Sequence, residues 1–269
     1  MARAELNGIS IAYDDLGGGG DAVVFVHGHP FDRSMWSPQY PLFGKSGWRA
    51  LVPDLRGYCE TTVVPGKTTL DVFARDIAAL ADHVGIGRLV IVGLSMGGQI
   101  AMEFCRQYPQ RVRGLVLAAT TPQAETAEGK VNRNAMADRL LREGLVPYAE
   151  EVLTKMVAPR NIEALPAVAE KVMGMMRSAP PEGAAAALRG RAERPDYRDT
   201  LGGLDAPALV VVGDEDGFTT RADADLMHGL LRNSELCWMP GVGHMPNLER
   251  EAEFNAALKR FLASVFAAA

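Results

Sequence analysis

The chain has 269 residues, 48% of them hydrophobic, which suits a single α/β domain that buries a large core. Its 28 basic and 33 acidic residues give a net charge of -5, and neither sign forms a long run. This balance argues against nucleic acid and against an anionic membrane surface as partners. From the net charge we expect a small neutral or mildly cationic substrate.

The start of the chain lacks the long apolar core of a signal peptide, and no later segment has the apolar length of a membrane span. We therefore expect a cytoplasmic protein with no membrane partner. Cys59, Cys105 and Cys237 are odd in number and widely spaced, without a CxxC or metal-spaced His/Cys cluster. We interpret them as buried free thiols and expect neither a metal nor a cofactor. The sequence does not indicate an oligomeric state.

Short apolar runs alternate with helical patterns along most of the chain, after a hairpin pattern that begins at residue 8. Buried strands are predicted at 22–26, 49–54, 89–92, 114–119, 208–213 and 235–239. Helices are predicted at 70–84, 98–108, 221–231 and 254–265. The alternation indicates the α/β class, with a mostly parallel central sheet and helices on both faces.

This rhythm stops between residues 123 and 195, where no strand pattern is convincing. Helical patterns rich in Ala, Met, Leu and Glu occur there instead, at 136–145, 148–156 and 162–176. We interpret 123–195 as a helical cap over the carboxyl edge of the sheet. The cap would be inserted in a core made of residues 1–122 and 196–269.

A Gly-x-Ser-x-Gly turn at residues 93–97 lies between a buried strand and a helix. A serine hydroxyl becomes a useful nucleophile when it is exposed on a tight turn beside a base, and small neighbours let backbone pack closely there. The flanking strand and helix are the context that this motif requires. We therefore predict that Ser95 is a catalytic nucleophile on a nucleophile elbow.

The base that Ser95 needs is sought among five histidines, because imidazole titrates near neutral pH. His83 and His228 fall inside helical segments without polar neighbours, so we interpret them as surface or packing residues. His244 lies in a glycine-flanked loop directly after the last predicted strand, at the sheet edge where the elbow also opens. We predict that His244 is the general base.

The acid that orients the histidine is expected between the serine and the histidine in the chain. The loop after the strand at 208–213 offers Asp214, Glu215 and Asp216. Asp216 is far enough past the strand to turn inward, whereas Asp214 is better placed to begin the turn or to cap the next segment. We predict Asp216 as the third member of the triad.

An oxyanion needs preorganised donors, which backbone N–H groups beside the nucleophile and after an early strand can supply. The Met96 N–H is the first predicted donor. His29 is chosen for the second because Pro30 has no N–H, and Phe31 is the alternative. The side chain of His29 either lines the site or faces solvent, and we do not assign it as a base.

Five blocks of the chain, in this order, resemble those of the α/β-hydrolase superfamily, in its esterase, enol-lactonase and cofactor-free haloperoxidase branches. They are His27–Pro30, Asp54–Gly57, Gly93–Gly98, Gly213–Asp216 and Gly241–His244. The resemblance implies an α/β-hydrolase fold, a Ser95–His244–Asp216 triad and a cap that shapes the pocket. The serine at the elbow distinguishes the chain from aspartate-nucleophile members of the fold. Cys59, two residues after the second block, stands where members of the superfamily usually have a glycine.

Together these features predict a serine hydrolase that cleaves a small carboxylic ester or lactone through an acyl-enzyme. Enol-lactone opening, perhydrolysis of the haloperoxidase kind and C–C bond hydrolysis use the same triad and stay open, as does a ligand sensor without turnover. In the cap, several methionines can either line an apolar pocket or pack in a helical core: Met136, Met156, Met173, Met175 and Met176. Three cap arginines can either meet a substrate carboxylate or face solvent: Arg139, Arg142 and Arg177.

Overall fold

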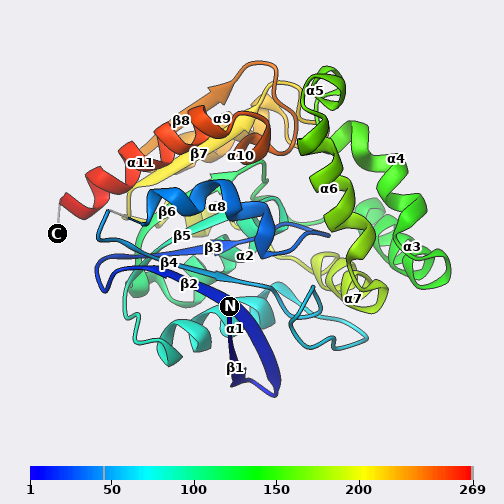
Figure 1. The fold of residues 1–269 in the computed structure, drawn as a ribbon, viewed down its shortest axis with the longest axis horizontal. Coiled ribbons are helices and arrows are strands. Elements are labelled where there is room, and N and C mark those ends of the chain that lie inside the picture. The colour runs from blue at the N-terminus through cyan, green and yellow to red at the C-terminus, as the bar shows by residue number, and fades with distance from the viewer. Residues whose placement is uncertain (45, 268–269) are drawn as a thin grey trace.

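The computed structural model describes residues 1–44 and 46–267 and is built around an eight-stranded sheet (Figure 1). Six strands run parallel: β3 (Ala22–Val26), β4 (Arg49–Pro53), β5 (Leu89–Leu94), β6 (Val112–Ala118), β7 (Ala208–Gly213) and β8 (Ser234–Met239). An antiparallel hairpin of β1 (Ala2–Leu6) and β2 (Ile9–Gly17) adds to the edge at β4, giving the order β1-β2-β4-β3-β5-β6-β7-β8. The predicted fold class and the mostly parallel sheet are confirmed.

Helices cover both faces of the sheet, as expected for parallel strands that are buried on both sides. On one face, α1 (Leu70–His83) and α2 (Met96–Gln107) pack together, and α8 (Arg198–Gly202) and α9 (Arg221–Leu230) continue the layer. On the other face lie α11 (Glu251–Ala267) and the 3-10 segment η1 (Arg33–Leu42). Alternate strand residues serve the two layers: Val24 and Ile91 belong to the first core, and Phe25 and Val92 to the second.

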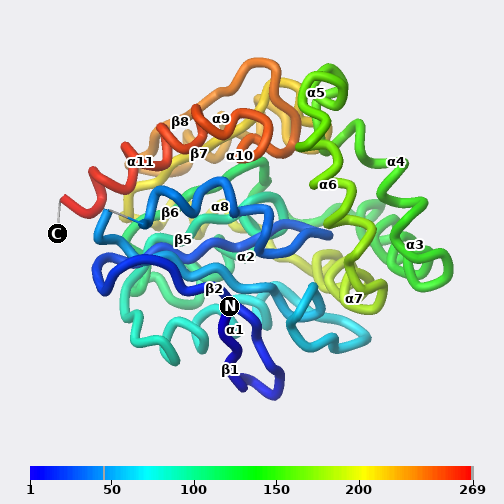
Figure 2. The backbone as a smooth tube through the Cα atoms, viewed as in Figure 1, coloured from blue at the N-terminus to red at the C-terminus, as the bar shows by residue number. Residues whose placement is uncertain are grey.

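Five helices are inserted between β6 and α8 and gather at one end of the sheet (Figures 1 and 2). They are α3 (Ala127–Glu143), α4 (Val146–Met156), α5 (Pro159–Ala164), α6 (Pro166–Ser178) and α7 (Pro181–Arg191). Figure 2 shows the chain leaving the sheet in green and returning in yellow to β7. The remaining short elements of the chain are η2 (Pro109–Arg111) and α10 (Pro246–Glu249).

Helix α7 was not expected from the sequence, because its run of alanines has no apolar periodicity. Its composition follows from how closely it packs on the core. A Cβ added to Gly183 would overlap the carbonyl group of Gly57, and one added to Gly190 would overlap that of Thr68. The Thr68 N–H also donates to the carbonyl of Ala186 at 3.0 Å. Larger side chains would push α7 away from the core loops.

Three other features differ from the sequence-based expectations or extend them. Strand β1 and the 3-10 segment η1 had no predicted counterpart, and two prolines inside η1 explain why its pattern was not helical. Cys105 is buried, but Cys59 is exposed and Cys237 is half-buried, so the expectation of three buried thiols is correct only for Cys105. None of the helices in the described residues has the length and apolar character needed to cross a bilayer.

Candidate active site

The elbow places Ser95 in a backbone conformation that few side chains adopt. Ser95 has φ 57° and ψ -117°, between the end of β5 and the start of α2. Such strain is maintained only where the surroundings impose it. A Cβ on Gly93 would overlap the carbonyl group of Gly97, and one on Gly97 would overlap that of Val26. The glycines of the motif are therefore required by close backbone packing around the serine.

His244 lies in the loop after β8 and is held by a buried carboxylate. Its Nδ1 is 2.9 Å from both Oδ1 and Oδ2 of Asp216, and the two side chains are only 3% and 0% exposed. Because a carboxylate only accepts, the proton is on Nδ1 and Nε2 is left as a base. Asp216 Oδ1 also accepts from the N–H groups of Phe218 and Thr219 at 2.8 and 3.1 Å, which fix its orientation.

The other two acids of the same loop have different partners. Asp214 accepts from the N–H of Gly241 at 2.5 Å, and so ties its own loop to the loop that carries His244. Glu215 forms an ion pair with Arg160 of α5. Of the three carboxylates in succession, only Asp216 contacts His244. Asp214 holds the turn before the histidine and does not cap the next helix, which begins with a Thr220 capping box.

A second buried carboxylate, which the sequence analysis did not single out, organises the histidine loop. Glu249 is 3% exposed, and its Oε1 accepts from the N–H of Gly243 at 3.0 Å and of Met245 at 3.3 Å. Its Oε2 accepts from the N–H of Ala158 at 2.9 Å and from Asn161 Nδ2 at 2.7 Å, both near the start of α5. Glu249 therefore joins the loop of His244 to the inserted helices.

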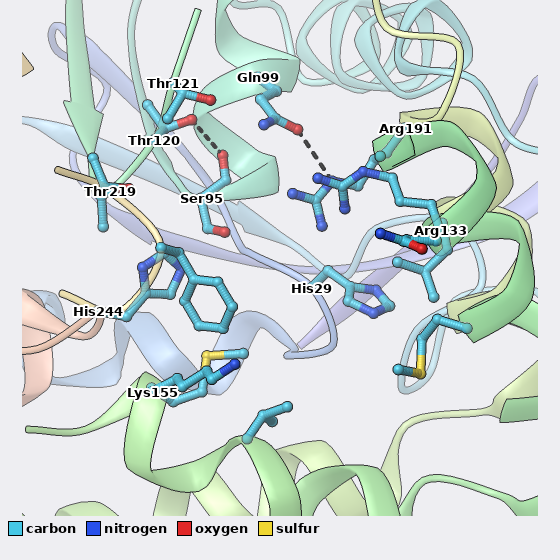
Figure 3. A pocket seen from close by; sticks show the side chains of 18 of the residues that line it. His29, Ser95, Gln99, Thr120, Thr121, Arg133, Lys155, Arg191, Thr219 and His244 are labelled. Atoms are coloured by element: carbon cyan, nitrogen blue, oxygen red, sulfur yellow. Dashed lines mark hydrogen bonds between the residues drawn. The ribbon is translucent and has the colours of Figure 1, made fainter. Parts of the chain in front are cut away.

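Ser95 and His244 face the same cavity, which has a volume of about 610 Å³ (Figure 3). Ser95 is 9% exposed and opens into it. The Ser95 hydroxyl and the His244 ring form no hydrogen bond in this structure. Such contacts often become tight only when substrate is bound. The structure thus brings all three predicted triad residues to one edge of the sheet.

The backbone hydrogen bonds around the cavity bear on the choice of oxyanion donors. The Phe31 N–H donates to the carbonyl of Gly28 at 3.1 Å and is no longer available, which favours His29 over this alternative. In the part of the chain that the structure describes, no protein group accepts from the N–H of His29 or of Met96. Two backbone donors are therefore left beside Ser95 for an oxygen of a bound molecule.

Two further histidines near the elbow have positions that sequence could not fix. His27 is fully buried, accepts from the Leu55 N–H through Nε2 at 2.9 Å and donates from Nδ1 to the carbonyl of Gly28. Burial lowers its pKa, so it is a neutral link between two loops. The His29 side chain lines the cavity, with Nδ1 2.8 Å from the Tyr58 hydroxyl. Burial, followed by the charges of Arg191 and Arg133, holds the pKa of His29 well below its usual value.

The side of the cavity opposite the triad is strongly basic. Arg133 of α3, Arg191 of α7 and Arg194 line it, while Lys155 of α4 lines the cavity on the side of His244 (Figure 3). Figure 3 shows Arg133 and Arg191 on one side and Ser95 and His244 on the other, with His29 between them. No aspartate or glutamate lines this cavity among the described residues.

The cap methionines considered from sequence fall into two groups. Met136 of α3 and Met156 of α4 line the cavity. The methionines of α6 pack in the second core instead: Met176 is fully buried, Met175 is 5% exposed, and Met173 is half-buried against the same cluster. Met156 also packs in the second core, so both interpretations of the cap methionines hold, and at Met156 they hold together.

The three cap arginines considered from sequence do not line the cavity. Each pairs with a glutamate on the surface of the inserted helices. Arg139 pairs with Glu143 and Glu151, Arg142 with Glu143, and Arg177 with Glu150. The arginines that do reach the cavity were missed, because nothing in the helical pattern distinguishes an inward arginine from an outward one.

Within residues 1–44 and 46–267, no group of three or more His, Cys, Asp or Glu side chains is arranged to hold a metal ion. The candidate site combines Ser95, the paired His244 and Asp216, the backbone N–H groups of His29 and Met96, and a basic wall.

The family model for the alpha/beta hydrolase fold matches residues 21–251. The chain belongs to the α/β-hydrolase family. Among solved structures, this α/β-hydrolase is similar to a thermophilic esterase from Thermogutta terrifontis in a malate-bound form, with a TM-score of 0.95 and 38% identity over 99% of this chain and 100% of that one.

Two curated relatives of this α/β-hydrolase have other activities in their names. The 3-oxoadipate enol-lactonase 2 of Acinetobacter baylyi is 28% identical over 244 residues, covering 89% of each chain. A 2-hydroxy-6-oxononadienedioate/2-hydroxy-6-oxononatrienedioate hydrolase of Burkholderia vietnamiensis is 27% identical over 94% of this chain and 91% of that protein. The family and a hydrolase function are therefore supported, while the substrate differs among relatives.

Proposed function

We propose that this protein hydrolyses a small carboxylic ester or lactone through an acyl-enzyme formed on Ser95. The observation that carries the proposal is the buried pair of His244 and Asp216, with Nδ1 2.9 Å from both carboxylate oxygens, facing the cavity into which Ser95 opens. A histidine held in this tautomer is suited to remove a proton from a serine hydroxyl.

In the proposed first step, His244 Nε2 takes the Ser95 proton while the oxygen attacks the ester carbonyl carbon. The carbonyl oxygen becomes an oxyanion, which the N–H groups of His29 and Met96 stabilise. The bond to the leaving oxygen then breaks, and the imidazolium protonates the departing alcohol. Asp216 stabilises the charged ring without taking its proton.

In the second step, water replaces the alcohol. His244 accepts a proton from water as the water oxygen attacks the acyl carbon, and the second oxyanion lies on the same two donors. Collapse releases the carboxylic acid and returns the proton to Ser95. For a lactone, the alcohol and the acid are ends of one product.

We also propose that residues 123–195 act as a cap that determines which substrates fit. Support comes from the cavity lining, which combines core residues such as Ser95 and His244 with Met136 and Tyr148 of the inserted helices. The link from Glu249 to the start of α5 fixes the cap against the histidine loop. Substitutions in the cap are expected to change substrate preference more than the chemical step.

C–C bond hydrolysis is the second candidate, because the relative from Burkholderia vietnamiensis that covers most of the chain is named for dienedioate substrates. It would use the same Ser95, His244 and oxyanion donors. Kinetics with esters, lactones and vinylogous diketones on one enzyme preparation separate the two candidates by relative kcat/KM.

A fluorophosphonate probe with peptide mapping, run beside a series of 4-nitrophenyl esters, tests the proposal. We expect labelling of Ser95 and turnover of short-acyl esters, both lost in Ser95→Ala. Stoichiometric ligand binding with no turnover of any ester, lactone or diketone would instead identify a sensor. Absence of labelling in a folded preparation would contradict a nucleophilic Ser95.

A further inference from the structure

We propose that the substrate carries a carboxylate besides the bond that is cleaved, and that Arg191 and Arg133 bind it. The proposal deepens the proposed hydrolase function and rests on it. The geometry that points to it is an excess of guanidinium groups on the cavity wall opposite Ser95.

Among the described residues, a single carboxylate pairs with arginines of this wall, and it reaches two of the three. Glu125, whose side chain is 8% exposed, pairs with Arg133 and, at 2.7 Å, with Arg194. Arg194 also donates from Nε to the carbonyl of Gln123 at 2.9 Å, so it is largely engaged. Three positive charges beside one negative charge leave this part of the cavity with a surplus of two positive charges.

Arg191 has no carboxylate partner within the residues that the structure describes. Its one hydrogen bond to protein there runs from Nε to Oε1 of Gln99, at 3.1 Å. The two terminal nitrogens of its guanidinium are left for a bound molecule. Buried cations are normally paired, so an arginine that faces a cavity without a carboxylate partner among the described residues is suited to bind an anion.

The surroundings of Arg191 make its charge costly unless an anion binds beside it. Burial, together with Arg133 and then Arg194, lowers the pKa of its guanidinium well below the usual value. A guanidinium nevertheless keeps its proton in proteins, so the cost is borne as an unfavourable charge. A planar carboxylate can bind the arginine fork through two parallel hydrogen bonds and relieve this repulsion.

The position of Gln99 limits the distance between the two ends of the substrate. Gln99 follows Ser95 by four residues at the start of α2, which corresponds to about 6 Å of helix rise. Because Gln99 holds the Arg191 head, the anion would bind near the scissile carbonyl. We therefore expect a spacer of a few carbon atoms between the carboxylate and the cleaved bond.

This local charge overrides the expectation drawn from the whole chain. The net charge of -5 favoured a neutral or mildly cationic substrate. Inside a cleft with low-dielectric walls, nearby charges determine which ligand is attracted, and distant surface carboxylates are screened by solvent.

The test compares esters that differ in one charge. 4-Acetoxybenzoate and 4-acetoxybenzamide form the pair with the charge on the leaving group. The mono-4-nitrophenyl ester of glutaric acid and 4-nitrophenyl 5-amino-5-oxopentanoate form the pair with the charge on the acyl group. For each pair, the ratio of kcat/KM for the anion to kcat/KM for the amide is measured after subtraction of the uncatalysed rate.

We expect Arg191→Gln to lower this ratio by about tenfold or more for at least one of the two ester pairs. The reason is that the variant loses the two charge-assisted hydrogen bonds from the guanidinium to the carboxylate. Arg133→Gln should lower it in the same pair. Arg139→Gln is the matched control, because Arg139 lies on the same helix as Arg133 but pairs with surface glutamates. It should leave the ratio and both rates as in the wild type.

A readout independent of turnover is calorimetric titration of Ser95→Ala with glutarate and with glutaramide. Glutarate should bind more tightly, and Arg191→Gln in that background should abolish the difference. Equal ratios and equal binding in wild type and Arg191→Gln would overturn the carboxylate subsite while ester hydrolysis continues. Loss of the proposed function would look different: no ester of either charge would be hydrolysed, and Ser95 would not be labelled.

Discussion

The two walls of the cavity differ in how their charged groups are paired. The core wall carries Ser95 and His244, and the cap wall carries Arg133, Arg191 and Arg194. On the core wall, His244 binds Asp216, whose carboxylate is fixed by two backbone N–H groups, and a buried glutamate binds four donors from the surrounding loops. On the cap wall, guanidinium groups outnumber carboxylates. The difference agrees with the two proposals, in which the core wall is preorganised for chemistry and the charges of the cap wall are balanced by the substrate.

The sharpest test of the core wall is removal of its nucleophile. Ser95→Ala should lower kcat by about 10⁶-fold, because the triad acts as a unit. Steady-state kinetics with a neutral 4-nitrophenyl ester, together with circular dichroism to establish folding, measures this. Ser178→Ala, at the end of α6 where the hydroxyl donates to the carbonyl of Met175, is the control and should retain wild-type rates. Substantial activity in Ser95→Ala would place the chemistry elsewhere.

The role of the carboxylate is tested by Asp216→Asn. An amide at this position can donate to Nδ1 and would stabilise the wrong tautomer of His244, so kcat should fall by about 10⁴-fold with the fold retained. Glu215→Gln changes the neighbouring acid, which contacts Arg160 and not His244, and should have little effect on kcat. If both variants lost activity equally, the loop and not the Asp216 contact would be responsible.

The sequence predicted the core wall residue by residue because local rules determine it. The elbow is confined to a few positions in which glycines are needed for backbone clearance, and chain order restricts the acid and the base to two loops after strands. Both Asp216 and His244 lie on one sheet edge because parallel strands all end there. Their catalytic roles stay predictions until the kinetics are measured.

The cap wall could not be predicted in the same way. Arg133 is on α3, whereas Arg191 and Arg194 lie at and after the end of α7, and only tertiary packing brings these positions together. The amphipathic pattern of α3 is weak, so it does not separate Arg133 from the outward-facing Arg139. Helix α7 was not predicted either. Its alanines allow close packing on the core, but they give the sequence no apolar periodicity that would indicate a helix.

The junction between the two walls depends on Glu249. Glu249→Gln keeps the shape of the side chain. One carboxylate oxygen becomes an amide oxygen, and the other becomes an NH₂ group, which would face N–H donors in place of an acceptor. We expect a loss of about 2–4 kcal/mol in the free energy of unfolding and a fall in kcat, because the loop of His244 is released. Urea unfolding and ester kinetics measure both effects. Glu251→Gln, an exposed change nearby, should alter neither; an unchanged stability in Glu249→Gln would show that the loop does not rely on this carboxylate.

The buried His27, which links the loops of Gly28 and Leu55, leads us to expect that stability depends on pH. Burial lowers the pKa of His27 in the folded state, so below the unfolded value near 6.5 the unfolded chain binds a proton that the folded chain does not. Stability should therefore be fully present above that pH and decrease as the pH falls, by up to about 1.4 kcal/mol per pH unit. Carboxylates add to this decrease, so the measured quantity is the difference between wild type and His27→Gln in urea unfolding at several pH values. A constant difference across the acid range would contradict a buried neutral His27.

The smallest effect that we expect is a change in the free energy of unfolding caused by Arg191→Met. It directly tests whether the charges of the cap wall, unlike those of the core wall, lack partners in the protein. Arg191→Met retains much of the side-chain volume and removes a charge that faces Arg133 and Arg194 without a carboxylate of its own among the described residues. We expect an increase of about 1 kcal/mol in the free energy of unfolding, since replacing unpaired buried charge by an apolar chain is commonly stabilising. Wild type should gain more stability from added glutarate than the variant does, because only the wild type has the full anion site. Destabilisation in Arg191→Met without glutarate would mean that the arginine supports the fold, and the cap wall would then resemble the core wall in having its charges satisfied by the protein itself.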